Sequence, residues 1–414
     1  MKPKHAIVIG FLAAVGVIMY LAVGRTPSGP PSGPPSGPPS GPSSKAATGP
    51  VAPAGGPATS DPGAADVEIS FEYSTEKKDW LEAAVAAFQQ ANPRIHVKLI
   101  GKGSLDAAGA ILDGSDKPVL WSPADSLVAN LLAADWQTKN GAPLFPATGD
   151  SGPQPLLLTP LVFVVWEERA SVLVDPASHG QLSWKTIHKA VASPKGWAGI
   201  GGKPAWGFVT LGHTDPNKSN SGMQAIALMA YEYFHTTSGL TVEQLLDSKF
   251  QDFVAETERG VQRFESSTGT FMTDMIRFGP SKYDIAVVYE SLAVSQLDNA
   301  QGRWGSLHIY YPPVTIWSDH PVMLLDAPWV TGAQKQAAAR LIGFLRSTPI
   351  QTTALRFGFR PADTSVPMKT AEGANPFTRS AQYGLSLELP PAAQPPDGPV
   401  IRNMLMMWSR IVKK

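Results

Sequence analysis

The sequence contains no cysteine among its 414 residues. This absence excludes disulfides, thiolate nucleophiles, Cys-ligated metal sites and a lipid anchor attached through cysteine. The chain also lacks an excess of either charge, since 34 basic side chains balance 34 acidic ones. Without a basic excess, the sequence does not predict binding to nucleic acid or to an anionic membrane surface.

The signatures of common enzyme sites are missing as well. The chain has no G-x-S-x-G elbow, Walker lysine, H-E-x-x-H or G-x-G-x-x-G after a strand, and its eight histidines are scattered. His213, close to Asp215, is the histidine nearest a candidate site, and we interpret it as a surface-loop residue. We therefore predict no enzyme, no metal and no cofactor; a hydrolase would need an acid–base pair in a cleft, which the sequence does not show.

A long apolar run is present near the N-terminus, at residues 6–24 (AIVIGFLAAVGVIMYLAVG), after Lys2 and Lys4. At 1.5 Å per residue it spans roughly 29 Å, enough to cross a hydrocarbon core. The lysines place residues 1–5 in the cytoplasm. A cleavable signal peptide is the alternative, but the run is long and no clear A-x-A site follows. We predict an uncleaved, single-pass signal anchor in a bacterial cell membrane.

Proline, glycine and serine dominate residues 25–65, where the unit Pro-Pro-Ser-Gly repeats. Such a composition cannot form a core and indicates a disordered linker with polyproline character. Extended at about 3 Å per residue, some forty residues would reach on the order of 100 Å. The folded part is therefore predicted to stand outside the cytoplasm, in the periplasm or at the cell surface, on a tether.

Strand and helix patterns alternate from residue 66 onward. Strand-like segments at 67–73, 95–100 and 119–121 alternate with helical patterns, an order that predicts parallel strands. Each strand is followed by a polar loop that begins a helix, and ligands of open α/β sheets bind beyond the carboxyl ends of strands. The candidate ligand contacts in these loops are Ser74, Thr75 and Ser104.

The segment from His213 to Phe234 (HTDPNKSNSGMQAIALMAYEYF) contains a second candidate site. A polar loop leads into a helix whose apolar positions recur every three to four residues. Unpaired N–H groups and the helix dipole at such a start can hold an anion or a polar ligand. Ordinary helix capping is the alternative. The candidate contacts here are Ser219, Asn220, Ser221 and Gly222.

Later segments complete the predicted pattern. The apolar run 156–166 is interpreted as two strands separated at Pro160, 206–210 as a strand and 265–273 as a loop. A buried strand at 283–290 ends in Tyr289 and Glu290, which are further candidates. If Glu290 lies beside the ligand, it favours a cation, an amine or a polyol as that ligand. The alternative is that Glu290 forms a salt bridge to one of three lysines, namely Lys77, Lys78 or Lys102.

Taken together, these motifs resemble the type II periplasmic solute-binding proteins of ABC importers, nearest to the molybdate/sulfate-like branch. The resemblance is carried by YSTEKKDW, GKGS, WSPADS, DPNKSNSG, DIAVVYES and TGAQKQAAARLIGFLRSTPIQTTALRFGFRP, and covers roughly residues 66–361. It implies an α/β fold of two lobes, each a mostly parallel sheet flanked by helices. Lobe 1 would contain residues 66–160 and 320–414, and lobe 2 residues 161–319.

The resemblance also implies how a ligand is held. In the oxyanion-binding branch, hydroxyls and backbone N–H groups at helix starts do so. Carried over by position, they fall on Ser74 or Thr75, on Ser104, on 219–222 and on Tyr289, with a fourth loop near 267–270. We therefore expect a membrane-tethered protein that closes two lobes over a small polar, oxyanion-like ligand for ABC-type uptake or sensing, with a permease or another membrane protein as partner. The alternative is a non-enzymatic interaction or structural module that has lost small-ligand binding.

Overall fold

The computed structural model describes residues 65–146, 149, 152–174, 181–302, 304–369 and 375–412. The predicted anchor at 6–24 and almost all of the linker at 25–65 lie outside the described residues. Among the helices within these ranges, none has both the length and the apolar character that a bilayer crossing requires.

The first of two sheets has the strand order β2-β1-β3-β10-β4. Its strands are β1 (Val67–Tyr73), β2 (Ile95–Gly101), β3 (Leu120–Ser122), β4 (Gln154–Pro155) and β10 (Pro321–Leu324). As predicted, β1 runs parallel to β2 and β3, whereas β10 is antiparallel to β3 and β4. The alternation in β1 buries Ile69 and Phe71 completely, and burial of each such side chain stabilises the fold by about 1.5–3 kcal/mol.

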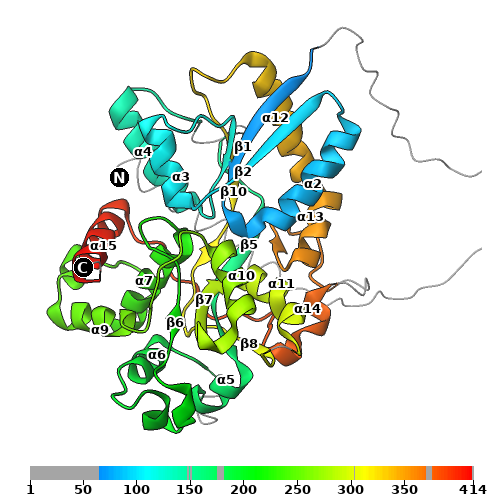
Figure 1. The fold of residues 1–414 in the computed structure, drawn as a ribbon. Coiled ribbons are helices and arrows are strands. Elements are labelled where there is room, and N and C mark those ends of the chain that lie inside the picture. The colour runs from blue at the N-terminus through cyan, green and yellow to red at the C-terminus, as the bar shows by residue number, and fades with distance from the viewer. Residues whose placement is uncertain are drawn as a thin grey trace, which may run out of the picture. The chain divides into compact units, whose positions relative to one another are not determined.

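Helices flank this first sheet to form lobe 1 (Figure 1). They are η1 (Thr75–Lys77), α2 (Lys78–Ala91), α3 (Ser104–Asp113), α4 (Ser126–Asn140), α12 (Gly332–Leu345) and α13 (Thr348–Ala354). Helix α12 packs on β1, β10 and α2, so a segment from late in the chain completes the core of the first lobe.

The second sheet is built around one long strand. Its strands are β5 (Leu157–Trp166), β6 (Leu211–Gly212), β7 (Ile285–Tyr289), β8 (Leu307–Tyr310), β9 (Trp317–Ser318) and β11 (Arg360–Pro361). The apolar run is therefore a single strand that continues through Pro160, and the prediction of two strands is wrong. Strand β5 is antiparallel to β7, β8, β9 and β11, and the parallel pair is β6 with β7. The expected mostly parallel sheet is thus wrong for this lobe.

Lobe 2 carries most of the remaining helices. They are α5 (Glu167–Leu173), α6 (Trp184–Val191), α7 (Asn220–Tyr233), α8 (Val242–Leu245), α9 (Ser248–Glu258), α10 (Thr268–Phe278), α11 (Glu290–Ala300), α14 (Pro376–Arg379) and α15 (Gly398–Ile411), with short 3-10 turns η3 (Gly196–Ile200), η4 (Pro204–Trp206), η5 (Gly279–Ser281), η6 (Leu355–Phe357) and η7 (Ala381–Tyr383). The strand predicted at 206–210 is absent there, since a 3-10 turn occupies its start. The loop predicted at 265–273 becomes helical at Thr268.

The C-terminal helix α15 packs on α7, α8 and α9 of lobe 2 (Figure 1). The sequence placed this helix in lobe 1, because the lobe boundary there rested on the order of segments alone. Its buried residues, among them Met404 and Trp408, instead fill the face of lobe 2 that lies beside α4 of lobe 1.

The two lobes touch directly through backbone groups. The N–H groups of Leu105 and Asp106, in the first turn of α3, both donate to the carbonyl oxygen of Lys218 in lobe 2, at 3.1 and 3.2 Å. Gly103, the residue before α3, permits this approach, since a Cβ there would lie 2.6 Å from the carbonyl oxygens of Lys218 and Ser266. The structure is therefore that of a closed pair of lobes.

We expect Gly103→Ala to destabilise the closed arrangement by about 1–3 kcal/mol, because the added methyl group meets two rigid carbonyls. The backbone at Gly103 has φ −61° and ψ 141°, which alanine adopts without strain. Small-angle scattering should show a larger radius of gyration, and thermal unfolding a lower Tm. The matched control is Gly109→Ala in the same helix, where nothing lies within 4 Å and about 0.5–1 kcal/mol of stabilisation is expected. Unchanged scattering from the Gly103 variant would contradict direct lobe contact at this point.

Candidate functional site

Buried polar side chains from both lobes, together with the half-buried Asp319, meet where the first and second sheets face each other. Lobe 1 contributes the end of β1 with η1 and the β3–α4 connection, and lobe 2 contributes the start of α7 and the end of β7. The β9–β10 connection, which crosses between the sheets, supplies the rest. The members, called here the interlobe polar cluster, are Ser74, Glu76, Lys77, Ser122, Asp125, Asn220, Gln224, Tyr289, Ser318, Asp319 and His320.

Lys77 is a fully buried cation in this cluster. Its ammonium donates to the carbonyl oxygens of Ser122 and Pro123, at 2.9 and 3.2 Å, and to the hydroxyl of Ser74. These three bonds use all three donors that an ammonium group has. Burial lowers the pKa of Lys77 to about 8, against the opposing effect of Glu76. The group is therefore charged at neutral pH and bound entirely within lobe 1.

Glu76 is the carboxylate partner of Lys77, with 3.7 Å between its Oε1 and the Nζ. Burial by itself would raise the pKa of Glu76, but the charge of Lys77 and the neighbouring His320 outweigh burial and lower the pKa to about 2. His320 Nδ1 lies 3.1 Å from the same Oε1, although the oxygen is off the donor direction of the ring and no well-directed hydrogen bond forms. Burial and the charge of Lys77 lower the pKa of His320 to about 4, so its ring is neutral.

The backbone at His320 is strained, with φ at +42°. A bulky residue seldom adopts a positive φ, and such strain is found most often at functional sites. The conformation brings the ring edge-on to Tyr289 and Phe359, with centroids 5.7 and 5.3 Å away. The crossing between the sheets therefore presents an imidazole to the centre of the cluster.

Two carboxylates occupy the N-terminus of α4. The N–H of Ser126 donates to Asp319 at 2.8 Å, and the N–H of Leu127 to Asp125 at 2.7 Å. Burial, followed by the charge of Asp319, raises the pKa of Asp125 to about 8, and burial also raises the pKa of Asp319. Burial therefore favours the protonated form of each of these two carboxyl groups. The helix terminus that would attract an anion is occupied by groups of the chain itself.

Side chains of α7 join the lobes across the cluster. Gln224 donates through Nε2 to Asp125 of lobe 1 and to Ser318, both at 2.9 Å. Asn220 donates through Nδ2 to Tyr289 at 3.0 Å and to Ser318 at 3.3 Å. Both amides are buried, and the hydrogen bonds of their nitrogen atoms determine how they are oriented. The amide oxygen atoms therefore face away from Asp125, Tyr289 and Ser318.

Five buried atoms of the cluster have no hydrogen-bond partner within the described part of the chain. They are Ser122 Oγ, Asn220 Oδ1, Gln224 Oε1 and both ring nitrogens of His320. An unmade hydrogen bond to a buried polar group costs about 1–3 kcal/mol, so each such group calls for an explanation. Because both lobes and the crossing segment supply these atoms, a solute enclosed between the lobes would account for them.

Beside this cluster, lobe 2 holds a group of four hydroxyls, called here the hydroxyl cluster. Ser221 Oγ lies 2.8 Å from Thr214 Oγ1 and 2.6 Å from Thr268 Oγ1. Ser219 Oγ is 3.4 Å from Ser221 Oγ and 3.3 Å from Thr268 Oγ1. Because Ser219 turns toward these hydroxyls, its side chain does not cap α7. Thr268 begins α10 and lies in the 267–270 loop that the resemblance indicated.

The other candidates from lobe 1 and from the start of α7 contact backbone groups of the chain. Thr75 is half-buried and accepts a hydrogen bond from the N–H of Gly269, across the lobes, at 3.3 Å. Ser104 is buried and accepts from the N–H of Ala124 at 3.0 Å. Gly222 packs so closely on Thr214 that a Cβ would lie 2.2 Å from its carbonyl oxygen. These three residues hold the loops in place around the two clusters.

Glu290 follows Tyr289 but is bound elsewhere. Both of its carboxylate oxygens accept from Arg360, at 2.8 Å each, and Tyr311 donates to one of them. None of the three lysines suggested by the sequence is its partner. The bidentate pair connects α11 to β11, and its carboxylate has no oxygen left over for a ligand.

The prediction that His213 is a surface-loop residue is wrong, because the residue is completely buried. Its Nε2 lies 2.9 Å from Glu258 of α9, and its Nδ1 lies 2.9 Å from the carbonyl oxygen of Thr214. Burial by itself would lower the pKa of His213, but the charge of Glu258 outweighs burial and raises the pKa. This histidine therefore anchors the loop before α7.

Sequence reasoning missed most of the polar side chains at the centre of the cluster. The missed members are Glu76, Lys77, Gln224, Ser318, Asp319 and His320. One signal was present for Gln224, since it interrupts the apolar helix pattern of 223–234 and a polar residue within a buried helix must find a partner. Asp319 and His320 lie between two very short strands, where the sequence shows no periodic pattern.

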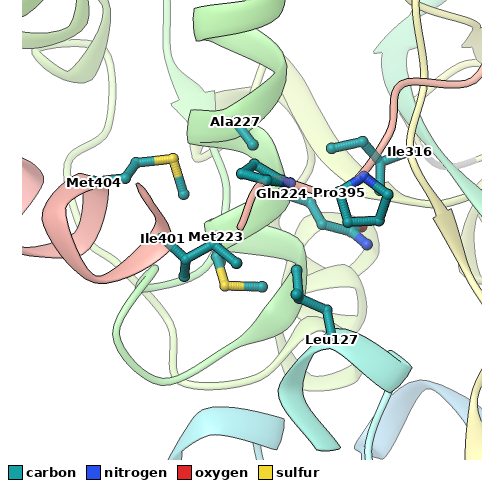
Figure 2. A pocket seen from close by; sticks show the side chains of 9 residues that line it. Leu127, Met223, Gln224, Ala227, Ile316, Pro395, Ile401 and Met404 are labelled. Carbon is teal, nitrogen blue, oxygen red and sulfur yellow. The ribbon is translucent and has the colours of Figure 1, made fainter. Parts of the chain in front are cut away.

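Helix α15 borders the junction between the lobes. Figure 2 shows Ile401 and Met404 of α15 near Leu127 of α4 and Met223 of α7. They surround a cavity of about 10 Å³, roughly the room of one water molecule. Arg402 of α15 also pairs with Asp135 of α4, at 2.7 and 3.1 Å. The C-terminal helix thus fastens lobe 2 to lobe 1 beside the cluster.

The raised pKa of Asp125 predicts a pH dependence. A carboxyl group whose pKa is raised in the folded state contributes stability that is present below its unfolded pKa and is lost as pH rises toward 8. Asp319→Asn removes the neighbouring charge and should lower the pKa of Asp125. The free energy of unfolding should fall from pH 5 to pH 7.5 in both proteins. We expect this fall to be smaller in the variant than in the wild type by about 1–2 kcal/mol.

Urea unfolding at both pH values measures this difference. Burial raises the pKa of Glu72 to about 8 as well, but both proteins share this group and its effect cancels in the comparison. Asp326→Asn, at an exposed carboxylate paired with Lys335, is the matched control and should leave the pH dependence unchanged. Parallel curves for wild type and Asp319→Asn would show that Asp319 does not raise the pKa of Asp125.

Comparisons with known proteins agree with this architecture. A sequence model described as bacterial extracellular solute-binding protein matches residues 71–360. A search among curated proteins finds no significant match. Among solved structures, the sulfate-binding protein SubI from Mycobacterium tuberculosis has 14% identity and a TM-score of 0.53, covering 79% of this chain and 93% of its own.

Two further solved structures are similar to the same extent. A periplasmic thiamin-binding protein has 13% identity and a TM-score of 0.58, covering 84% of this chain and 96% of its own. The periplasmic binding protein AfuA from Actinobacillus pleuropneumoniae has 15% identity and a TM-score of 0.52, covering 84% and 98%. At these identities the structures show a shared fold. The family match over most of the folded chain goes further, and the chain belongs to the bacterial extracellular solute-binding protein family.

Proposed function

We propose that this protein binds a small polar solute between its two lobes and serves ABC-type uptake or sensing without catalysing a reaction. The observation that carries the proposal is the set of buried, unpartnered polar atoms that both lobes and the crossing segment contribute. The contacts would be made by residues of the interlobe polar cluster and the hydroxyl cluster. The resemblance favours an oxyanion-like ligand, and the solved relatives named above are described as binding sulfate, thiamin or fructose-6-phosphate.

The proposed site includes part of the set that the sequence indicated. Ser74, Asn220 and Tyr289 would line it from the interlobe polar cluster, and Ser219 and Ser221 from the hydroxyl cluster. Thr75, Ser104 and Gly222 would position these residues, and Glu290 would have a structural role through Arg360. The proposed lobes are those of the sequence interpretation, except that the start of β5 and the segments after α13, namely η6, β11, α14, η7 and α15, move to lobe 2.

The proposed location follows from residues 1–65. A membrane helix at 6–24 and a flexible linker at 25–65 would hold the folded part outside the cytoplasm while letting it reach a permease or another membrane protein. The lysines of the first residues and the length of the apolar run support this proposal.

A thermal-shift screen of the full-length chain tests the proposed function. Oxyanions, metal ions, sugars, amines and amino acids are added singly. A solute present at one hundred times its Kd should stabilise the fold by about 2.7 kcal/mol and raise the Tm. If no compound in the screen raises the Tm, the solute-binding proposal is contradicted.

A non-enzymatic interaction module is the second candidate function, and one observation favours it. The N–H groups that begin α3 and α4 are occupied by Lys218 and by two carboxylates of the chain itself, so the closed lobes already fill part of the site. Pull-down from membranes with and without residues 26–65 separates the candidates. Loss of a partner on deletion of the linker, together with a screen that gives no ligand, would favour the module.

A further inference from the structure

The donors and acceptors of the interlobe polar cluster are unequally satisfied. On the donor side, the ammonium of Lys77 donates its three N–H groups to Ser74, Ser122 and Pro123. The first turn of α4 donates to Asp125 and Asp319, and the first turn of α3 donates to a carbonyl of lobe 2. The groups that would hold an oxyanion on the lobe 1 side are therefore taken.

On the acceptor side, the chain leaves atoms without partners. Asn220 Oδ1 and Gln224 Oε1 are amide oxygens, which accept hydrogen bonds and cannot donate them. The nitrogen atom of Gln224 donates to Asp125 and to Ser318, which leaves the oxygen atom on the other side of the amide. His320 Nε2 is a third acceptor, because the ionised Glu76 beside Nδ1 favours the proton on that nitrogen. Each residue is at least 98% buried.

The charges of the cluster also disfavour an anion. Glu76 is paired with Lys77, so the negative charge left in the cluster lies on the acidic pair Asp125 and Asp319. An added anion would meet this charge in a buried site, where repulsion is weakly screened. A cationic amine would find each carboxylate already bonded, to Lys77, to Gln224 or to the N-terminus of α4. A neutral molecule is not repelled by the acidic groups and needs no free carboxylate as a partner.

Lobe 2 adds donors that a hydroxyl can use. Ser219 does not cap α7 with its side chain, so the first N–H groups of that helix, beside Asn220, are without a side-chain cap. Ser122 Oγ can donate or accept. A hydroxyl group donates one hydrogen bond and accepts others, and a molecule with several hydroxyls can satisfy amide oxygens, imidazole and N–H groups together.

We propose that the solute is a neutral polyhydroxylated molecule, a sugar or polyol, and that Asn220, Gln224 and His320 are the acceptors that select it over an oxyanion. This inference rests on the proposed solute-binding function and deepens it. The lobes must separate to admit the solute, since they touch at Gly103 and Lys218.

The test is calorimetric titration of the full-length chain with three sets of probes: neutral sugars and polyols, the oxyanions sulfate, phosphate and molybdate, and the amines putrescine and choline. We expect binding from the first set. Asn220→Leu should weaken that binding by about tenfold or more, the effect of one lost hydrogen bond with an unsatisfied partner. Asn220→Asp keeps an acceptor oxygen and should restore binding of the neutral probe.

Asn299→Leu on the exposed face of α11 is the matched control and should leave binding unchanged. Thermal unfolding of this variant and of the two Asn220 variants checks that each protein is folded. Binding of an oxyanion or an amine without a neutral polyol would overturn this inference and leave the solute-binding function supported. Binding of none of the probes, in a chain whose Tm no other compound raises, would overturn both.

Discussion

Replacing Lys77 by methionine should lower the free energy of unfolding by about 3–5 kcal/mol, the usual cost of breaking a buried ion pair from one side. The ammonium is completely buried, and its removal leaves Glu76 without its main charge partner. It also removes the donor that the carbonyls of Ser122 and Pro123 share. Urea unfolding followed by circular dichroism measures the loss.

A double-mutant cycle separates the charge effect from the packing effect. Glu76→Gln combined with Lys77→Met removes both charges and should recover about 1–3 kcal/mol relative to Lys77→Met alone. The adjacent Lys78→Met is the matched control, because Lys78 is exposed and pairs with Glu82 at the surface. Its effect should stay within about 0.5 kcal/mol. Equal losses from Lys77→Met and Lys78→Met would contradict the buried ion pair.

Acid unfolding provides a second readout of the same pair. The pKa of Glu76 is lowered from 4.5 to about 2, so its contribution to stability is fully present above pH 4.5 and is lost as the pH falls toward 2. In Lys77→Met the pKa of Glu76 should rise, because burial then acts without the opposing ammonium. The acid transition of this variant should therefore begin at a higher pH than that of the wild type.

The first lobe shows what the sequence can predict. Strand β1 alternates apolar and polar residues, and α2 repeats its apolar positions at helical spacing, so both are predicted by local pattern. The polar loops at the ends of β1 and β2 follow from the same pattern, which is why Ser74 and Ser104 could be named. Their hydroxyls do lie at the junction of the lobes, with local partners that the sequence does not reveal.

The centre of the cluster depends on contacts between distant segments. His320 reaches it because β10 pairs with β3, some two hundred residues earlier, and both strands are too short to show a pattern. Lys77 lies in a charged run, where a lysine is normally exposed, and its burial is decided by carbonyls of the β3–α4 connection. His213 is buried for a similar reason, since its carboxylate partner belongs to α9.

The mostly parallel sheet expected for lobe 2 follows from the resemblance, and no local pattern corrects it. The apolar run of β5 indicates a buried strand. Four segments that follow later in the chain pair with it antiparallel, and three of them are only two to four residues long. Hydrophobicity identifies the strand as central but carries no information on the direction of such short partners.

Trp408→Ala should lower the free energy of unfolding by about 3–5 kcal/mol, because a large buried side chain is replaced by a cavity at the base of α15. Trp408 is completely buried, packs edge-on against Phe264 with ring centroids 5.0 Å apart, and donates through Nε1 to Glu258 at 3.0 Å. The other oxygen of Glu258 is bound to His213. The substitution therefore also loosens the loop that leads into α7.

Two variants on the same residue and helix separate these contributions. Trp408→Phe keeps most of the volume but loses the hydrogen bond to a charged group, and about 1.5–3 kcal/mol is expected. Met406→Ala is the matched control, since Met406 is 61% exposed on α15 and its loss should cost within about 0.5 kcal/mol. Hydrogen exchange decides the lobe assignment: in Trp408→Ala, α15 and α9 should lose protection together while α2 of lobe 1 keeps it. Loss of protection in α2 instead would place α15 with lobe 1, as the sequence alone predicted.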